Sequence, residues 1–278
     1  MGNDRFALAP EAVDVLTNPD SLFFAGGGVM AVMTLTKNVS AFTGCFQTGL
    51  GLAYDTLGVD CALGLDQMGG GWKRQKLVQD VLPMLDGVME KLEQGALVAH
   101  IGCGPGTGAM VMASAFPQST FHGFDTSRHA VHEAHQRSLA AGLANVFWHH
   151  LDDEPLPQDQ RFDFITTHDV VHATTHPLDF IKAVYQAIKP NGIWYLTDIA
   201  GRSSFEENLR NHPLASMLYA FSVLLCMSSG LSKPGGAGLG TLGFHEAVAR
   251  QMTREAGFAS FRRLAVDDEF NNHYEVRP

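Results

Sequence analysis

Between residues 96 and 200 the chain alternates between short apolar runs and longer segments with helical spacing. Such runs are typical of buried parallel strands, and helices connect them. This alternation predicts a doubly wound α/β sheet whose strand carboxyl ends lie along one edge, where ligands bind. Strands are expected at 96–101, 120–124, 146–150, 162–167 and 193–197, with helices at about 105–116, 127–141 and 177–188, the second capped by Ser127.

The residues before and after this unit have a different pattern of apolar and polar positions. Residues 1–80 have helical patterns broken by glycines, and the amphipathic stretch 72–93 should be kinked or split at Pro83. After the fifth strand, 213–231 predicts one long apolar helix, followed by a glycine-rich loop at 233–243. A helix at 244–256 and strands at 261–266 and 272–276 are then expected to complete a seven-stranded, mostly parallel, Rossmann-like sheet.

These patterns divide the chain into two parts. Residues 1–80 are predicted to form a helical cap that contributes to a substrate pocket. Residues 81–278 are predicted to form the Rossmann-like domain, with a helical lid at about 203–243.

Composition and charge narrow the functional classes. Of the 278 residues 45% are hydrophobic, enough for a sizeable core. A formal net charge of −10 argues against a broad basic surface for nucleic acid. No uninterrupted apolar run is long enough for a membrane span, no signal peptide opens the chain, and none of the four cysteines forms a CxxC pair. We therefore expect a cytoplasmic protein whose partner is a small-molecule substrate. The sequence leaves open whether it forms a homodimer.

A glycine-rich turn follows the first predicted strand and opens the next helix. It contains Gly102, Cys103, Gly104 and Gly106, and glycines there allow a ligand to approach the backbone at a helix N-terminus. Asp125 ends the second strand nineteen residues after Gly106, where a carboxylate can accept hydrogen bonds from ribose hydroxyls. The packed glycines favour a nucleoside without pyrophosphate. A relaxed dinucleotide pattern is also satisfied, which leaves a nicotinamide-dependent oxidoreductase as an alternative.

The segment Val98–Gly108 resembles motif I of the class I S-adenosylmethionine-dependent methyltransferases. Phe124-Asp125 is similar to the ribose-binding acid of that family, and Leu151-Asp152-Asp153 to the loop that meets the adenine. The segments 162–172 and 188–193 resemble its fourth strand and the turn before its fifth. The resemblance implies S-adenosylmethionine as the cofactor, bound by His100, Gly102, Cys103, Gly104, Gly106, Asp125, Thr126, Asp152, Asp153 and His168.

The likeness extends to a bacterial subgroup in which a winged helix and a helical linker precede the catalytic domain. Segments after the fifth strand, among them 211–215 and 235–241, carry it, while the winged helix has no counterpart in this sequence. One position departs from the family, because His100 stands where most members have Asp or Glu for the methionine end of the cofactor. A protein that binds S-adenosylmethionine but has lost or repurposed its chemistry is therefore a second hypothesis.

Three histidines follow the fourth strand at intervals of four. His168, His172 and His176 would share a face on one helix, but Pro177 restricts His176 away from helical geometry, so we expect no metal site. His172 is the candidate general base for methyl transfer to a hydroxyl, with Asp169 as its helper or an alternative base. Transfer by positioning alone is also open.

Two apolar segments flank the predicted strand ends and could cover a pocket for an apolar or aromatic substrate. The sequence thus predicts methyl transfer from S-adenosylmethionine to an oxygen or nitrogen of a small molecule of that kind. The candidate pocket residues are Phe24, Phe46, Tyr54, Tyr219 and Phe221.

Overall fold

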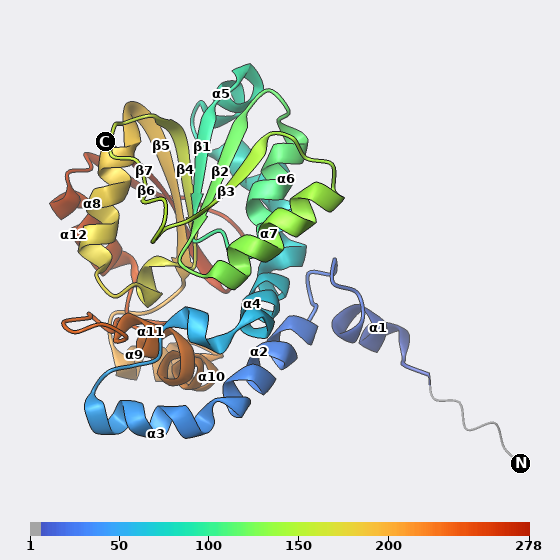
Figure 1. Ribbon diagram of the computed structural model, residues 1–278, viewed down its shortest axis with the longest axis vertical. Helices are drawn as coiled ribbons and strands as arrows, with labels where there is room; N and C mark the ends of the chain where they lie inside the picture. The colour runs from blue at the N-terminus through green and yellow to red at the C-terminus, as the bar shows by residue number, and fades with distance from the viewer. Residues whose placement is uncertain (1–6) are drawn as a thin grey trace, which may run out of the picture.

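The computed structural model describes residues 7–278 and contains a seven-stranded sheet between two layers of helices (Figure 1). The strands lie in the order β3-β2-β1-β4-β5-β7-β6. Neighbours among β1–β5 are parallel, and β7 is antiparallel to both β5 and β6. The doubly wound, mostly parallel sheet predicted from the sequence is confirmed. Its strands are β1 (Leu97–Ile101), β2 (Thr120–Asp125), β3 (Val146–His150), β4 (Phe162–His168), β5 (Ile188–Ile199), β6 (Ser260–Arg263) and β7 (Asn271–Arg277).

Alternating side chains of the central strands fill two separate cores. Val98 and Phe164 pack with the helices on one face, whereas Ala99 and Ile165 pack with those on the other. Both faces are therefore apolar, and this accounts for the uninterrupted apolar runs in the sequence. The first face is covered by α5 (Val88–Gln94), α6 (Thr107–Ala115) and α7 (Arg128–Ala140), the second by α8 (Pro177–Ala187) and α12 (Glu246–Ala256) (Figure 1).

The segment before β1 is helical, as the sequence predicts. The stretch expected to be split at Pro83 consists of a π-helical segment, η2 (Lys73–Val81), the short turn η3 (Leu82–Met84), which contains Pro83, and α5. Before it lie α1 (Pro10–Leu16), α2 (Gly26–Lys37), α3 (Val39–Thr48), η1 (Tyr54–Leu57) and α4 (Val59–Trp72).

The long helical stretch expected at 213–231 is confirmed, because residues 215–230 are helical without a break and contain a π-helical turn in the middle. Ser222 begins a π-helical turn, and its hydroxyl accepts a hydrogen bond of 3.1 Å from the amide of Thr241. Gly240 packs so closely that a Cβ would lie 2.2 Å from Ser222 Oγ. The loop after the insertion thus packs onto this irregular turn. The elements are α9 (Phe205–Asn211), α10 (Ala215–Phe221), η5 (Ser222–Cys226) and α11 (Met227–Gly230).

The N-terminal helices and the insertion after β5 form one cap at the carboxyl edge of the sheet (Figure 1). A shared apolar cluster joins them, with Leu35 and Phe42 from the N-terminal helices against Leu225 from the insertion. This arrangement places the cap over the edge where the class of fold binds ligands. Residues 1–6 of the predicted cap lie outside the described residues, and no helix within 7–278 is long and apolar enough to cross a membrane.

Candidate active site

The glycine turn between β1 and α6 has a shape that requires glycine. Gly102 has a φ of +70°, and a Cβ there would lie 2.2 Å from Val170 Cγ2. Gly106 has a φ of +90°, and its Cβ would lie 2.5 Å from the Trp148 ring. Gly104 also has a positive φ, of +54°, but nothing lies within 4 Å of its Cβ position. The turn is therefore tightly packed except at Gly104, where a ligand can approach the backbone.

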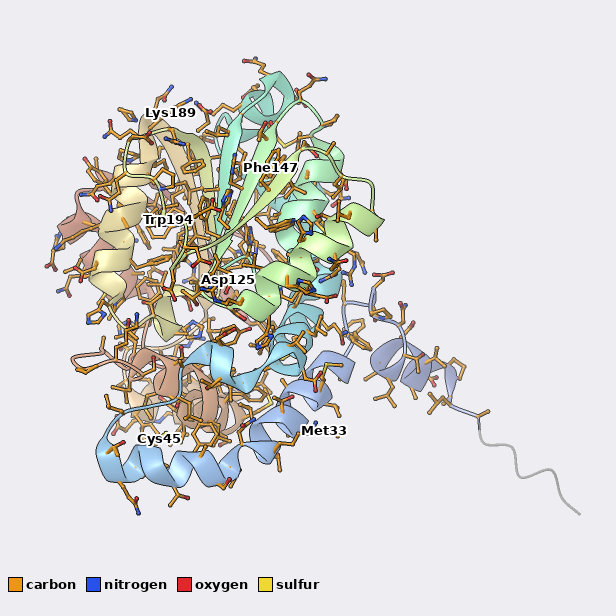
Figure 2. The ribbon with its side chains drawn as sticks, viewed as in Figure 1. Met33, Cys45, Asp125, Phe147, Lys189 and Trp194 are labelled. Atoms are coloured by element: carbon orange, nitrogen blue, oxygen red, sulfur yellow. The ribbon has the colours of Figure 1, made fainter. Side chains whose placement is uncertain are left out.

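Asp125 lies beside that open position, at the carboxyl end of β2 (Figure 2). Its Oδ2 accepts a 2.8 Å hydrogen bond from the amide of Gly104, and its Oδ1 accepts one of 2.8 Å from the amide of Ser127. Burial raises the pKa of Asp125, and these amide donors oppose that shift. Each carboxylate oxygen has a second lone pair, so the side chain can still accept hydrogen bonds from two ribose hydroxyls. The turn and its acid thus fit an adenosine.

His100 is buried under the glycine turn, in contact with α6. Its Nδ1 shares a 2.8 Å hydrogen bond with the hydroxyl of Thr166, and a Cβ on Gly108 would lie 2.9 Å from its ring. Burial lowers the pKa of His100 to about 3, so the imidazole is neutral at pH 7. It therefore neither repels a cofactor ammonium by charge nor attracts it as the usual acid does.

His172 and Asp198 form a buried pair at the ends of β4 and β5. His172 Nδ1 lies 2.5 Å from Asp198 Oδ1. Burial lowers the pKa of His172, but Asp198 and Cys226 outweigh it and raise the pKa well above 6.5. The sequence analysis named His172 but missed its partner Asp198. Asp198 ends a strand like the other site residues, a signal that could have pointed to it.

Asp169 follows β4 in a strained conformation, with a φ of +57° that few residues other than glycine adopt. Its Oδ1 accepts a 2.9 Å hydrogen bond from the side-chain amide of Asn271. Desolvation by the surrounding protein and the charge of Asp198 raise the pKa of Asp169 to about 6, although the residue keeps solvent-exposed surface. The charges of Asp198 and His172 both influence the Asp169 carboxyl.

The predicted row of three histidines does not lie on one helix. His168 ends β4, His172 lies in the 3-10 turn η4 (Val171–Ala173), and His176 is the residue before α8. Within residues 7–278 no three His, Cys, Asp or Glu side chains come together as a metal site would require. The row therefore divides into one residue near His100, one paired with Asp198, and one at the surface.

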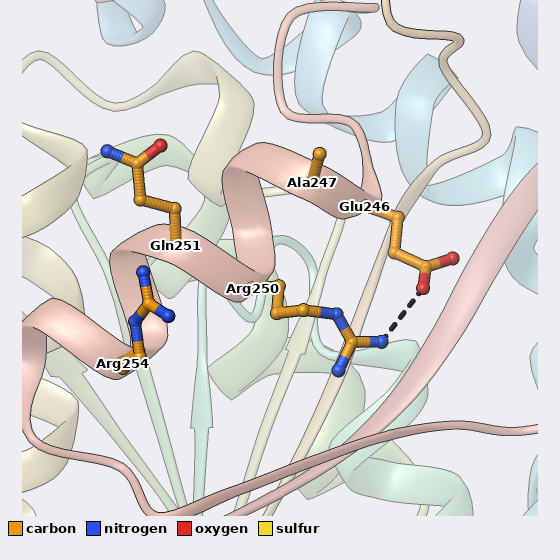
Figure 3. Close-up of a pocket in the computed structure, with 5 residues that line it drawn as sticks. All are labelled: Glu246, Ala247, Arg250, Gln251 and Arg254. Atoms are coloured by element: carbon orange, nitrogen blue, oxygen red, sulfur yellow. Dashed lines mark hydrogen bonds and ion pairs between the residues drawn. The ribbon is translucent and has the colours of Figure 1, made fainter.

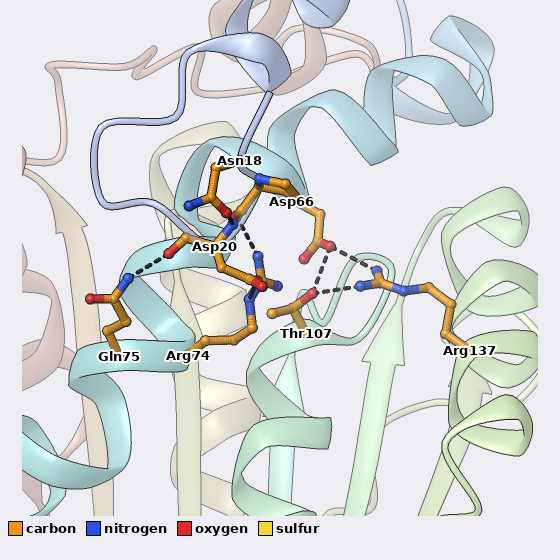
Figure 4. Close-up of polar contacts among 8 residues, drawn as sticks. Asn18, Asp20, Asp66, Arg74, Gln75, Thr107 and Arg137 are labelled. Carbon is orange, nitrogen blue, oxygen red and sulfur yellow. Dashed lines mark hydrogen bonds and ion pairs between the residues drawn. The ribbon is translucent and has the colours of Figure 1, made fainter. Parts of the chain in front are cut away.

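A polar cluster that the sequence analysis missed joins the cap to the glycine turn (Figure 4). Asp66 of α4 accepts hydrogen bonds from the Thr107 hydroxyl at 2.7 Å and from Arg137 Nη1 at 2.8 Å. Arg137 also donates to the carbonyl of Pro105, inside the turn. The three side chains come from α4, α6 and α7, so only the folded chain brings them together. Asp66 thereby fixes the cap against the start of α6.

Asp66→Ala is expected to destabilise the protein by roughly 2–3 kcal/mol, because it leaves Arg137 and Thr107 without their buried acceptor. Thermal unfolding followed by circular dichroism measures this. Asp60→Ala is the matched control on the same helix, since Asp60 is exposed and makes only a long ion pair, with its Oδ2 3.9 Å from Lys37 Nζ. The control should change the free energy of unfolding by less than about 1 kcal/mol. Equal losses in both variants would contradict the bridging role of Asp66.

The acidic loop after β3 lies at the same edge of the sheet. Asp153 accepts two hydrogen bonds from Arg128, at 2.7 and 3.0 Å, whereas Asp152 is exposed. The backbone carbonyl of Thr126 is 3.0 Å from His150 Nε2. Asp153 is thus already paired, and Asp152 has its carboxylate turned to solvent. Their assignment to the adenine stays a prediction.

The five predicted pocket residues have different surroundings. Tyr54 and Phe221 pack against the apolar cluster of the cap, and burial and the charge of Asp125 raise the pKa of Tyr54. Tyr219 accepts a 3.1 Å hydrogen bond from Asn208, and the ring of Phe24 lies over Gly26. Phe46 lies one helical turn after the buried Phe42 on α3 and is 78% exposed. Its assignment to the pocket stays a prediction.

One shallow hollow of about 510 Å³ lies elsewhere, along α12 (Figure 3). Arg250 in its wall is paired with Glu246 at 3.0 Å. None of the predicted site residues lines this hollow, so it is separate from the candidate active site.

Comparison with known proteins agrees with this geometry. Residues 99–194 match a family model described as a methyltransferase domain. This stretch is therefore similar to a methyltransferase domain. The match spans β1 to β5 and contains the glycine turn, Asp125, His168 and His172. The match supports S-adenosylmethionine as the cofactor and speaks against the nicotinamide alternative.

Relatives and solved structures resemble parts or all of this chain. A fatty-acid O-methyltransferase of Mycolicibacterium smegmatis is 29% identical over 114 residues, 41% of this chain and 41% of that protein. This chain therefore spans less than half of that relative. An O-methyltransferase family protein from Burkholderia thailandensis has a TM-score of 0.69 at 15% identity, covering 100% of this chain and 79% of that one. Human N-acetylserotonin methyltransferase with S-adenosylmethionine has a TM-score of 0.63 at 16% identity, covering 97% and 74%. At such identities these structures share the fold.

Proposed function

We propose that the protein transfers the methyl group of S-adenosylmethionine to an oxygen or nitrogen of a small apolar or aromatic molecule. The observation that carries this proposal is the buried His172–Asp198 pair, 2.5 Å apart. It lies at the same edge of the sheet as Asp125 and the glycine turn, under the cap (Figure 1). The His172 imidazole, which serves as the proton acceptor in this proposal, therefore lies at the same edge of the sheet as the proposed cofactor site.

The bound cofactor supplies an activated methyl group on its sulfonium, and the chain supplies position and proton transfer. Asp198 holds Nδ1 of His172, which leaves Nε2 for a proton from the acceptor. Asp169 provides a second carboxylate within this group of interacting charges. The cap excludes water and orients the acceptor, effects that by themselves accelerate methyl transfer.

The cap supports an apolar acceptor. Its cluster is built from Leu, Phe and Cys side chains, and Tyr54 and Phe221 lie against it. The relative from M. smegmatis is named for a fatty acid, which is also largely apolar. We therefore propose that the N-terminal helices form the upper wall of the acceptor pocket.

This proposal is tested by incubating the purified protein with S-adenosylmethionine and a panel of phenols, fatty acids and arylamines. Formation of S-adenosylhomocysteine together with a methylated product, detected by mass spectrometry, is the expected result. A panel of highly charged sugars and nucleotides serves as the control. Methylation confined to the charged panel would contradict the proposed acceptor class.

His100 favours a second candidate, a protein that binds S-adenosylmethionine and uses it for something other than methyl transfer. The neutral His100 stands where the family has an acid. Calorimetric binding of S-adenosylmethionine without methylation of any acceptor in the panel would support this second candidate over the first.

A further inference from the structure

Two aspartates of the cap contact the helices that begin beside the proposed cofactor site. Asp66 of α4 accepts a hydrogen bond from Thr107, the first residue of α6. Asp55 of η1 accepts a 2.6 Å hydrogen bond from the hydroxyl of Ser127, the N-cap residue of α7. Both contacts are favourable because the N-terminus of a helix carries a partial positive charge. They attach the cap to the Rossmann-like domain at two separate places.

The two attachments differ in strength. Asp66 is only 7% exposed, and its Oδ2 contacts both the Thr107 hydroxyl and the Arg137 guanidinium. Within residues 7–278 the side chain of Asp55 has a single hydrogen-bond partner, and Asp55 is only partly buried. A single hydrogen bond near solvent breaks more readily than a buried ion pair does. The attachment at η1 is therefore the one that can open while Asp66 keeps the cap in place.

The side chains of the candidate active site are covered by protein. Asp125 is only 6% exposed, and His168 and His172 are 7% and 3% exposed. η1 lies next to Asp125 because one residue bonds to both: Ser127 donates its amide to Asp125 and its hydroxyl to Asp55. A ribose that binds the Asp125 carboxylate needs more room than this burial leaves. The protein around Asp125 must therefore move, and η1 is held there by one side-chain hydrogen bond.

The chain on either side of η1 limits which residues can move. Before it, the Leu52 amide donates a 2.8 Å hydrogen bond to the Ser228 hydroxyl of α11, which fixes that end of the segment. After it, Gly58 has a φ of +78°, and no atom lies within 4 Å of its Cβ position. Glycine at such an open position can change its backbone angles at low cost. Movement is thus confined to residues 53–58, and Leu57, packed in the cap cluster, favours the return to the closed position.

We propose that η1 is a gate over the ribose side of the cofactor site, held shut by the hydrogen bond between Asp55 and Ser127. Breaking this bond lets η1 turn about Gly58 and uncovers Asp125. The inference rests on the proposed use of S-adenosylmethionine and adds a step that methyl transfer itself does not require. S-adenosylhomocysteine, the product of methyl transfer, then leaves only while the gate is open.

Stopped-flow binding of S-adenosylhomocysteine tests the gate, with the fluorescence of Trp148, which packs against the glycine turn, as the signal. Asp55→Ala should increase both the association and the dissociation rate constants about fivefold or more, because the bond closes the gate with and without ligand. The dissociation constant should then change by less than about twofold. Asp60→Ala is the matched control, an exposed aspartate of the adjoining helix α4, and should change neither rate constant.

Ser127→Ala provides a second, independent variant. It removes the hydroxyl that donates to Asp55, so both rate constants should rise as they do in Asp55→Ala. The double variant should be no faster than the Ser127→Ala variant, because both substitutions break the same bond. The accompanying loss of the α7 cap is the same in these two proteins. Accelerations that multiply in the double variant would overturn the assignment of this bond as the closing contact.

Hydrogen–deuterium exchange on the ligand-free protein examines the gate without any cofactor. In Asp55→Ala the amides of residues 54–58 should exchange faster than in the parent. Unchanged exchange, or a weaker affinity with an unchanged association rate constant, would overturn the gate. A parent protein that does not bind S-adenosylhomocysteine would instead refute the cofactor assignment on which the gate depends. Should Asp55→Ala unfold, Asp55→Asn keeps the size of the side chain, and a smaller acceleration of both rate constants is expected.

Discussion

Replacing His172 by alanine is expected to lower the turnover number about a hundredfold or more, while the affinity for S-adenosylmethionine stays unchanged. The imidazole is the group that would take the proton from the methyl acceptor. Its partner Asp198 lies at the end of β5, whereas the glycine turn follows β1, so the substitution should not disturb the cofactor site. Steady-state kinetics with calorimetry on the same samples measures both quantities. A loss confined to cofactor affinity would contradict the role of general base.

The pH dependence of this step follows from the raised pKa of His172. Only a neutral imidazole accepts a proton, so turnover should increase as the pH rises through the pKa of the folded protein. Asp198 raises that pKa well above 6.5, so the rise should occur at a higher pH than that at which a free imidazole titrates. Asp198→Asn removes the negative charge, so burial then dominates and the rise should move to lower pH.

Two further variants separate proton transfer from positioning. His172→Gln keeps one hydrogen bond and similar size but cannot take the proton at neutral pH. If the Gln variant turns over at nearly the parental rate with the same pH profile, His172 only positions the acceptor. In that case either Asp169 is the base or the reaction uses no base. His176→Ala is the control, because His176 is an exposed histidine before α8, only four residues away.

Replacing Asp125 by alanine is expected to weaken S-adenosylmethionine binding by roughly 1–3 kcal/mol, or about 5- to 150-fold. The substitution removes the acceptor for the ribose hydroxyls and also frees the amides of Gly104 and Ser127. Because those amides define the turn, Asp125→Asn, which keeps an acceptor oxygen, should lose less. Calorimetric titration measures both variants.

Asp163→Asn is the matched control for this loss. Asp163 also accepts a hydrogen bond from a backbone amide, that of Leu97 at 3.0 Å, but at the opposite edge of the sheet. Its replacement should lower stability without changing the affinity for S-adenosylmethionine. An affinity that stays at the parental value in Asp125→Ala would refute the assignment of the ribose acid.

The sequence by itself determined the central sheet and the glycine turn. Buried parallel strands need apolar side chains on both faces, so each strand has a continuous apolar run that is visible without any structure. The turn after β1 needs glycine at positive φ, and the Ser127 cap needs a side-chain acceptor for Ala130. These requirements concern residues that are close together in the chain, so they can be recognised from the sequence alone.

Tertiary structure alone decided which side chains meet. Asp198 reaches His172 from the next strand, and Asp66 reaches Thr107 and Arg137 from the cap, through contacts that no spacing rule encodes. Phe42 and Phe46 lie one turn apart on α3, yet only Phe42 is buried, because burial depends on the elements that pack beside each turn of the helix.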